Sequence, residues 1–125
     1  MSPDQDGDLE KLRAIALALP GAAERTSHGS PGFHIEGGKF FAYFWHNYHS
    51  DGETAVLVKT TGVDEMAALI EADPALYFKP AYLGPSGWIA IRTDASGSNW
   101  DHIGDRVAQS WEMVAPRRFL EAGGR

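Results

Sequence analysis

The clearest pattern of hydrophobic and polar positions in this chain lies near its end. Apolar residues recur there at steps of three and four, at Trp100, Ile103, Val107, Trp111 and Val114. This spacing places them on one face of an amphipathic helix, which Pro116 should end or kink. Weaker patterns of the same kind predict a first helix from Asp8 to Leu19 and another between Thr61 and Asp73.

Strand patterns occupy the stretches between these helices. Segments rich in β-branched or aromatic residues are found at 33–36, 39–46, 54–60 and 88–92, with a shorter one at Tyr77-Phe78. Gly37-Gly38 is a two-residue hairpin signal between the first two segments. Residues 20–32 contain several glycines and prolines, so we expect a loop there.

The order of these elements predicts the fold class. Short links between neighbouring strands favour antiparallel pairing, and helices stand before, between and after the strands. We therefore expect an α+β fold, a two-layer sandwich in which an antiparallel β-sheet carries its helices on one face. At 125 residues the chain suits a single domain, which we place at residues 8–122 behind a flexible N-terminal tail at residues 1–7.

Strand alternation separates the side chains of this sheet into two sets. The purely apolar set, which we assign to the helix-packed core, contains Phe40, Ala42, Phe44, Val56, Val58, Ile89 and Ile91. The other set combines cations with aromatic residues, namely Lys39, Lys59, Arg92, Tyr43, Trp45 and Trp88. Aromatic rings stack on bases, and Lys and Arg contact phosphate, so this second face is a candidate binding surface.

Charge and composition narrow the function classes. The chain carries 17 acidic and 11 basic residues, a net charge of −6, which argues against coating nucleic acid or an anionic membrane by bulk charge. Cysteine is absent, which excludes disulfides, thiolate metal sites and cysteine nucleophiles. The acidic N-terminus lacks the features of a signal peptide, and no apolar run is long enough to cross a bilayer. We therefore expect a cytoplasmic protein with no membrane partner.

Histidines provide a weak metal signal. His46, His49 and Asp51 place two imidazoles and a carboxylate close together in the sequence, but polar residues also gather at hairpin tips. His28 and Tyr82 could join His46 and His49 in lining a small-molecule or metal site. No combination of nucleophile, base and orienting group is recognisable, so we expect neither enzyme activity nor a cofactor.

Several segments together resemble the MmcQ/YjbR family of small bacterial proteins, from about Leu9 to Leu120. The segments that carry the resemblance are Leu19-Pro20-Gly21 with Glu24, Gly29, Phe33, Gly38 to Ala42, Lys59, Pro80 to Leu83, Trp88 and Ser110 to Arg118. The resemblance implies a CyaY-like fold, which agrees with the architecture predicted from the pattern. It also implies a DNA-binding label, because the family's fold resembles a double-wing DNA-binding module.

Three hypotheses of function remain open. The first is a non-enzymatic binding module for nucleic acid, DNA in particular, with a surface formed by Lys39, Tyr43, Lys59, Tyr82, Trp88 and Arg92. The second is a protein-interaction or dimerisation module that uses the same aromatic face. The third is a small-molecule or metal-binding protein. The exposure of Trp45 and Trp88 discriminates among them, because burial of both would remove the stacking surface.

Overall fold

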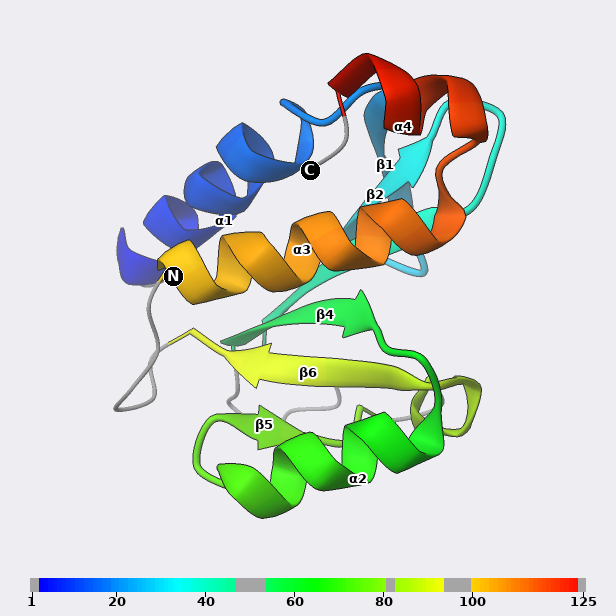
Figure 1. Ribbon diagram of the computed structural model, residues 1–125. Coiled ribbons are helices and arrows are strands. Elements are labelled where there is room, and N and C mark those ends of the chain that lie inside the picture. Colours follow the sequence, from blue (N-terminus) through cyan, green and yellow to red (C-terminus); the bar gives the residue numbers. More distant parts are fainter. Residues whose placement is uncertain (1–2, 47–53, 81–82, 94–99, 124–125) are drawn as a thin grey trace.

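A six-stranded antiparallel sheet organises the chain (Figure 1). The computed structural model describes residues 3–46, 54–80, 83–93 and 100–123. The strands are β1 (Ala22–Ser27), β2 (Ser30–Ile35), β3 (Phe40–His46), β4 (Thr54–Lys59), β5 (Tyr77–Phe78) and β6 (Trp88–Arg92). They lie side by side in the order β1-β2-β3-β4-β6-β5, and each neighbouring pair is antiparallel.

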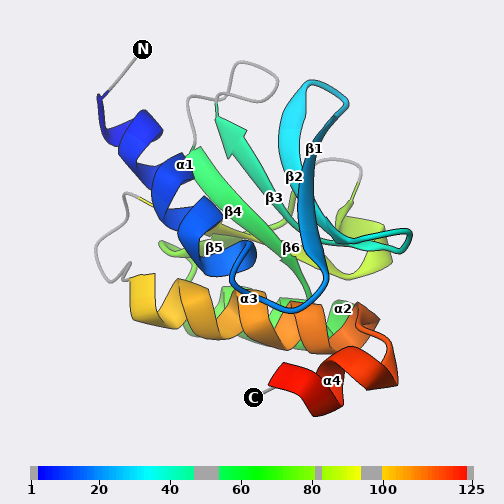
Figure 2. The same ribbon diagram turned by 90° about the horizontal axis from the view of Figure 1, so that it is seen from above.

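The helices lie on one face of this sheet (Figure 2). They are α1 (Pro3–Ala16), α2 (Val63–Ala72), α3 (Trp100–Val114) and α4 (Arg117–Gly123), with a short 3-10 helix, η2, at Gly84–Ser86. α1 and α3 pack against each other and against β3, α3 also contacts β4, and α2 contacts β5. The predicted α+β two-layer architecture is therefore confirmed. Within the described ranges, no helix has the length and apolar character needed to cross a membrane.

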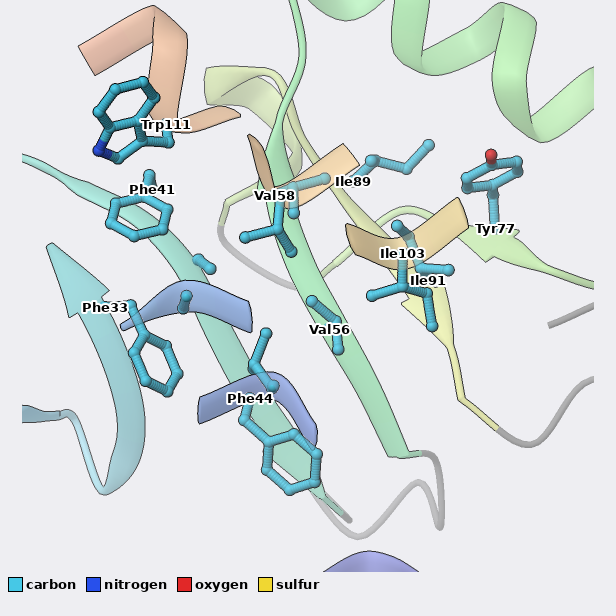
Figure 3. Packing of buried hydrophobic residues seen from close by; sticks show 14 of the residues in the cluster. Phe33, Phe41, Phe44, Val56, Val58, Tyr77, Ile89, Ile91, Ile103 and Trp111 are labelled. Carbon is cyan, nitrogen blue, oxygen red and sulfur yellow. The ribbon is translucent and has the colours of Figure 1, made fainter. Parts of the chain in front are cut away.

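Strand residues and the apolar stripe of α3 meet in one core (Figure 3). Ile103, Val107 and Trp111 of α3 are fully buried, as their spacing predicted. They pack with strand residues that include Phe33, Phe41, Val56, Val58, Ile89 and Ile91. Trp111 also donates its indole N–H to the carbonyl of Pro20 at 2.9 Å. This bond satisfies the polar atom of a buried ring and ties α3 to the connection between α1 and β1.

The first helix begins earlier than the apolar pattern predicted. α1 starts at Pro3 rather than near Asp8, so residues 3–7, which we expected in a flexible tail, are helical. Proline suits the first helical position because its φ is already close to the helical value and it lacks an N–H that would have no partner there. The helix therefore begins before Leu9, the first residue of the apolar pattern.

The predicted loop at residues 20–32 is instead a hairpin. β1 and β2 pair along their whole length, and the turn between them has positive φ at His28 (50°) and Gly29 (81°). Two successive positive φ values are typical of the tight turns whose twist suits antiparallel strands. β1 is an edge strand without large apolar residues, so its sequence lacks the alternation on which the strand prediction depended.

A β-bulge changes which residues of β3 face the helices. Phe33 pairs with Ala42 and His34 pairs with Phe40, which leaves Phe41 as the extra residue. Phe41 and Ala42 consequently both lie in the core, and Phe40 lies on the opposite face. The prediction that Phe40 is a core residue was therefore wrong. The assignments of β4 and β6 residues to the two faces are confirmed.

Ser110 of α3 supports this bulge. Its buried hydroxyl donates to the carbonyl of Phe41 at 2.6 Å and accepts the backbone N–H of Lys59 at 2.9 Å. The bulge interrupts the β3–β4 ladder at this point, since regular pairing begins at Ala42 and Val58. One serine therefore satisfies two main-chain groups that the interrupted ladder would leave unpaired.

Candidate functional site

The candidate site is the sheet face that points away from the helices, which we call the outer face. Directly paired strand residues share a face, and one row crosses the whole sheet through Arg25, Gly32, Tyr43, Leu57, Ala90 and Phe78. The same pairing adds the remaining residues of the outer face, namely Ala23, Ser27, Ser30, His34, Phe40, Trp45, Ala55, Lys59, Trp88 and Arg92.

A second, smaller apolar cluster supports the outer face. Leu57 and Ala90 are fully buried at its centre, beside Trp45 (8% exposed) and Trp88 (7% exposed). The side chains that pack against this cluster are only partly buried and are Phe40, Tyr43, Phe78 and Leu83. Burial removes the two tryptophan rings as stacking platforms, which corrects the role that we predicted for Trp88. Trp88 instead supports the residues around it.

Four rings follow one another across the outer face from β2 to β6, and we call them the aromatic row: His34, Phe40, Tyr43 and Trp88. Successive ring centroids lie 5.2, 5.0 and 5.0 Å apart. Phe40 and Tyr43 are stacked, with an interplanar angle of 22°, whereas Tyr43 and Trp88 are tilted by 48°. These separations are typical of favourable aromatic contacts, so the row is a continuous layer on the sheet.

Glycine at position 32 makes room for the aromatic row. A Cβ atom there would lie 2.7 Å from Cε1 of Phe40 and 3.0 Å from Cδ1 of Tyr43. Both distances are shorter than ordinary van der Waals contacts between carbon atoms. The close approach of two rings to the backbone of β2 therefore requires glycine at this position.

Three cations of the outer face each lie over an aromatic ring. The distances from the charged group to the ring centroid are 4.9 Å for Arg25 on Phe40, 5.9 Å for Lys59 on Trp88 and 4.5 Å for Arg92 on Phe78. Such contacts are attractive and hold the long side chains against the sheet. Arg92 also donates to two backbone carbonyls just before β5, each at 3.2 Å, whereas Arg25 is exposed to solvent.

Charge is divided between the two faces of the sheet. Among the described strand residues, the outer face carries three cations and no carboxylate. Glu24, the one acidic residue within these strands, pairs with the core residue Phe33 and accepts a hydrogen bond from Arg13 of α1 at 2.9 Å. The hydrogen bond to Glu24 raises the pKa of Arg13. The outer face is therefore a local basic surface on a chain of net charge −6.

Tyr43 lies in the middle of the aromatic row and brings a hydroxyl to it. Burial raises the pKa of Tyr43, while its hydrogen bond to Ser27 and the positive charge of Arg25 act in the opposite direction. The phenol is therefore neutral at physiological pH and is connected to β1. A neutral hydroxyl both donates and accepts hydrogen bonds, which adds a polar group between the cations.

The predicted surface residues are only partly brought together. The outer face holds Tyr43, Lys59, Trp88 and Arg92, and Tyr82 lies outside the described residues. Lys39 immediately precedes β3, and its carbonyl accepts the N–H of the core residue Ile35 at 3.0 Å. Because the next residue, Phe40, faces outward, strand alternation turns Lys39 away from the outer face. The bulge is the reason why the sequence-based phase placed Lys39 incorrectly.

The sequence analysis missed four aromatic or charged residues of the outer face, the first of which is His34 of β2, to which it assigned no face. Arg25 lies in the strand that was expected to be a loop, and Phe40 was assigned to the core. Phe78 follows from the short strand at Tyr77-Phe78, because pairing with Ala90 places it on the outer face. The only sequence signal for Arg25 is its alternation with Glu24 in β1, which separates the cation from the carboxylate.

The histidine-based metal candidates are not gathered within the described part of the chain. Nδ1 of His46 lies 2.6 Å from the hydroxyl of Thr54, and His28 lies in the β1–β2 turn. His49 and Asp51 lie outside the described residues, so their role stays a prediction. In the described ranges, no group of three or more His, Asp or Glu residues could hold a metal ion.

Comparisons with known proteins agree with the resemblance seen in the sequence. A sequence model of the family described as YjbR matches residues 17–113. Among solved structures, protein DR2400 from Deinococcus radiodurans, described as a DUF419 domain, is similar with a TM-score of 0.70 at 15% identity, over 91% of this chain and 86% of that one. At this identity the likeness shows the fold alone. None of the curated proteins compared matches the chain.

Proposed function

The chain belongs to the YjbR family, and we propose that it is a non-enzymatic binding module whose outer face binds single-stranded nucleic acid. The observation that carries this proposal is the division of charge: Arg25, Lys59 and Arg92 share one face of the sheet with no carboxylate among its described strand positions. The chain as a whole has an excess of acidic residues, so its net charge does not attract nucleic acid. Three cations on one face do attract a ligand with phosphate groups.

The shape of the surface favours a single strand over a duplex. Neighbouring strands lie about 4.8 Å apart, so six strands span roughly 24 Å, whereas the major groove of DNA is about 12 Å wide. The sheet face is therefore too broad to enter a groove, but sheets with aromatic side chains do bind splayed single strands. The partly exposed Phe40 and Tyr43 would contact bases, and the cations beside them would contact phosphates.

Fluorescence anisotropy with a labelled single-stranded oligonucleotide tests the proposal. Three phosphate contacts predict a slope of about −2 in log K against log salt, so a tenfold rise in salt should weaken binding about 100-fold. Arg25→Glu and Lys59→Glu should each weaken binding at low salt. Arg117→Glu is the matched control, because Arg117 is an exposed arginine on α4 and the substitution changes the charge equally.

Other outcomes of this measurement would reject the proposal or change the form of nucleic acid that it names. Absence of binding to single-stranded DNA and RNA at low salt would reject it. Tighter binding to duplex than to single strands would instead favour the double-wing mode that the family resemblance implies, with the β1–β2 hairpin as the groove-binding ribbon. A cytoplasmic location, which we also propose, would give the protein access to either kind of nucleic acid.

A dimer formed through the outer face is the weaker alternative. The partly exposed rings of Phe40 and Phe78 provide apolar surface for such contacts. A twofold axis would however place the same patch of each copy face to face, so the three cations of one copy would meet those of the other. This repulsion disfavours self-association and favours an acidic partner. A mass that is independent of concentration in sedimentation would remove the dimer.

A further inference from the structure

β1 leaves one edge of the sheet open. It pairs with β2 on one side, and no strand of the described chain pairs with its other side. The opposite edge strand, β5, has only two residues, whereas β1 has six and pairs without a register shift. Natural sheets protect such edges with proline, lysine, bulges or a short strand. β1 has none of these features, and its residues Arg25 and Thr26 are exposed to solvent.

Main-chain groups of alternate β1 residues point toward this open edge. The carbonyl of Gly21 accepts the N–H of Glu36 just beyond β2, so the odd-numbered residues of this segment face β2. The N–H of Ala22 points away from β2 and donates to a carbonyl of the α1–β1 connection. The same alternation directs the N–H groups of Glu24 and Thr26 away from β2, where the described residues provide no acceptor. Both donors are therefore free at an edge that water reaches.

We propose that a second copy of this chain occupies the open edge, with the two β1 strands antiparallel about a twofold axis at Glu24. In this register Glu24 lies opposite Glu24 of the second copy, and Thr26 lies opposite Ala22 of the second copy. The free N–H groups of Glu24 and Thr26 then donate to the carbonyls of Glu24 and Ala22 across the axis. Every free donor of the edge gains an acceptor, and the sheet continues through both copies.

Side-chain charges favour this register over the next one. A twofold axis one residue further along would use the same donors but would place Arg25 opposite Arg25 of the second copy, where like charges repel. With the axis at Glu24, Arg25 instead lies opposite the small Ala23. Each Glu24 carboxylate at the axis accepts hydrogen bonds from Arg13 at 2.9 and 3.0 Å, although Arg13 also contacts the more exposed Glu10. Arg25 has no carboxylate partner among the described residues, so facing arginines would stay uncompensated.

The edge dimer leaves the outer face open and enlarges it. A twofold axis perpendicular to the sheet keeps the outer faces of both copies on the same side, so they form one surface. Arg25 of each copy becomes a diagonal neighbour of the other across the axis, roughly 7–8 Å away. The strand contributes six residues per copy, against about 20–30 in a standard interface. We therefore expect a weak, concentration-dependent dimer that forms whether or not the outer face binds nucleic acid.

Amide exchange with water, followed by NMR on the unmodified chain without nucleic acid, tests the pairing. The amides of Glu24 and Thr26 should exchange more slowly as the protein concentration rises. At about 1 mM protein and a dissociation constant of about 1 mM, half of the chains are paired, so exchange should be about twofold slower than at high dilution. The amide of Arg25 faces β2 and should be protected at every concentration. Unchanged rates for Glu24 and Thr26 up to about 1 mM protein would overturn the proposal.

Single cysteines test the register, because the chain contains no cysteine of its own. Glu24→Cys would place two thiols opposite each other with Cα atoms about 5.5 Å apart, which a disulfide can span. Two Thr26→Cys residues would lie roughly 13 Å apart along the paired strands, which is too far. Arg117→Cys, at an exposed position of α4, is the control for random collisions. Oxidised glutathione should therefore convert only Glu24→Cys into a covalent dimer, and equal cross-linking of the three variants would reject the register.

Ala23 offers a matched pair of charge variants, because it lies opposite Arg25 only in this register. Ala23→Glu should lower the dissociation constant measured by sedimentation equilibrium, and Ala23→Lys should raise it. Each change should be roughly two- to 30-fold, since symmetry repeats the cross-strand contact twice. Equal dissociation constants for the two variants would contradict the register. If a variant does not fold, the amide measurement on the unmodified chain still decides.

Discussion

Replacing Ser110 with alanine should destabilise the protein where α3 meets the bulge in β3. The serine hydroxyl is fully buried and joins the carbonyl of Phe41 at 2.6 Å to the N–H of Lys59 at 2.9 Å. Alanine leaves both main-chain groups buried without a partner, and each such group costs about 1–3 kcal/mol. We therefore expect the free energy of unfolding to fall by about 2–6 kcal/mol in total, a large share of the roughly 5–15 kcal/mol typical of a domain.

Urea denaturation followed by tryptophan fluorescence measures this loss. With a denaturant slope of about 2 kcal/mol per molar urea, the midpoint should fall by roughly 1–3 M. Hydrogen exchange locates the effect, because the Lys59 amide loses its acceptor and should exchange much faster than the amides in the middle of β4. Ser86→Ala, at an exposed serine of η2, is the control and should leave the midpoint unchanged.

Ser110 also affects the candidate site through the bulge. The bulge places Phe40 on the outer face, so loss of its support should alter the near-ultraviolet circular dichroism of the aromatic row. A midpoint within about 0.3 M of the parent, together with a Lys59 amide that stays protected, would refute the argument. That result would show that the interrupted ladder satisfies its main-chain groups without Ser110.

Three further predictions follow from contacts on either face of the sheet. Gly32→Ala places a Cβ 2.7 Å from a ring of the aromatic row, so we expect a loss of about 1–3 kcal/mol in urea denaturation and weaker oligonucleotide binding. Glu24→Gln breaks the bidentate ion pair with the half-buried Arg13 and should cost about 1 kcal/mol in the same assay, whereas Glu121→Gln on α4 should change nothing measurable. Burial raises the pKa of Tyr43 and Tyr77 above the ordinary value of 10.0. Folding therefore favours the neutral phenols. Their contribution to stability should be constant below pH 10 and should fall as the pH rises further, less steeply in Tyr43→Phe. A urea midpoint that does not fall above pH 10 would contradict this.

Local sequence patterns predicted the elements whose residues pack on one side only. The stripe from Ile103 to Trp111 alone identifies α3, because each of its members reaches the same core. In β4 and β6, strict alternation separates the helix-facing Val56 and Ile89 from the outer face. These predictions succeeded because each strand keeps its period of two along its whole length.

The remaining features depend on pairing between distant residues, which no local pattern contains. The bulge at Phe41 is stabilised by Ser110, 69 residues further along the chain, and it reverses the faces of Phe40 and Phe41. β1 is held by its neighbour β2 rather than by apolar residues of its own. Arg25 could therefore be placed over Phe40 only after the hairpin was known.

Burial of Trp45 and Trp88 determines how the outer face can bind. No α-helix within the described residues packs on this face, so Leu57 and Ala90 are shielded from water by the side chains of the face itself and by Leu83, next to η2. The tryptophans are buried beside Leu57 and Ala90, and the charged groups of Arg25 and Lys59 lie over the rings of Phe40 and Trp88. The phosphates of a nucleic acid would therefore contact these cations before its bases reach the rings. Phosphate contacts carry no sequence information. Since charges are screened beyond about 8 Å at physiological salt, the acidic remainder of the chain would not prevent a short strand from binding here, and selection by base sequence should be weak.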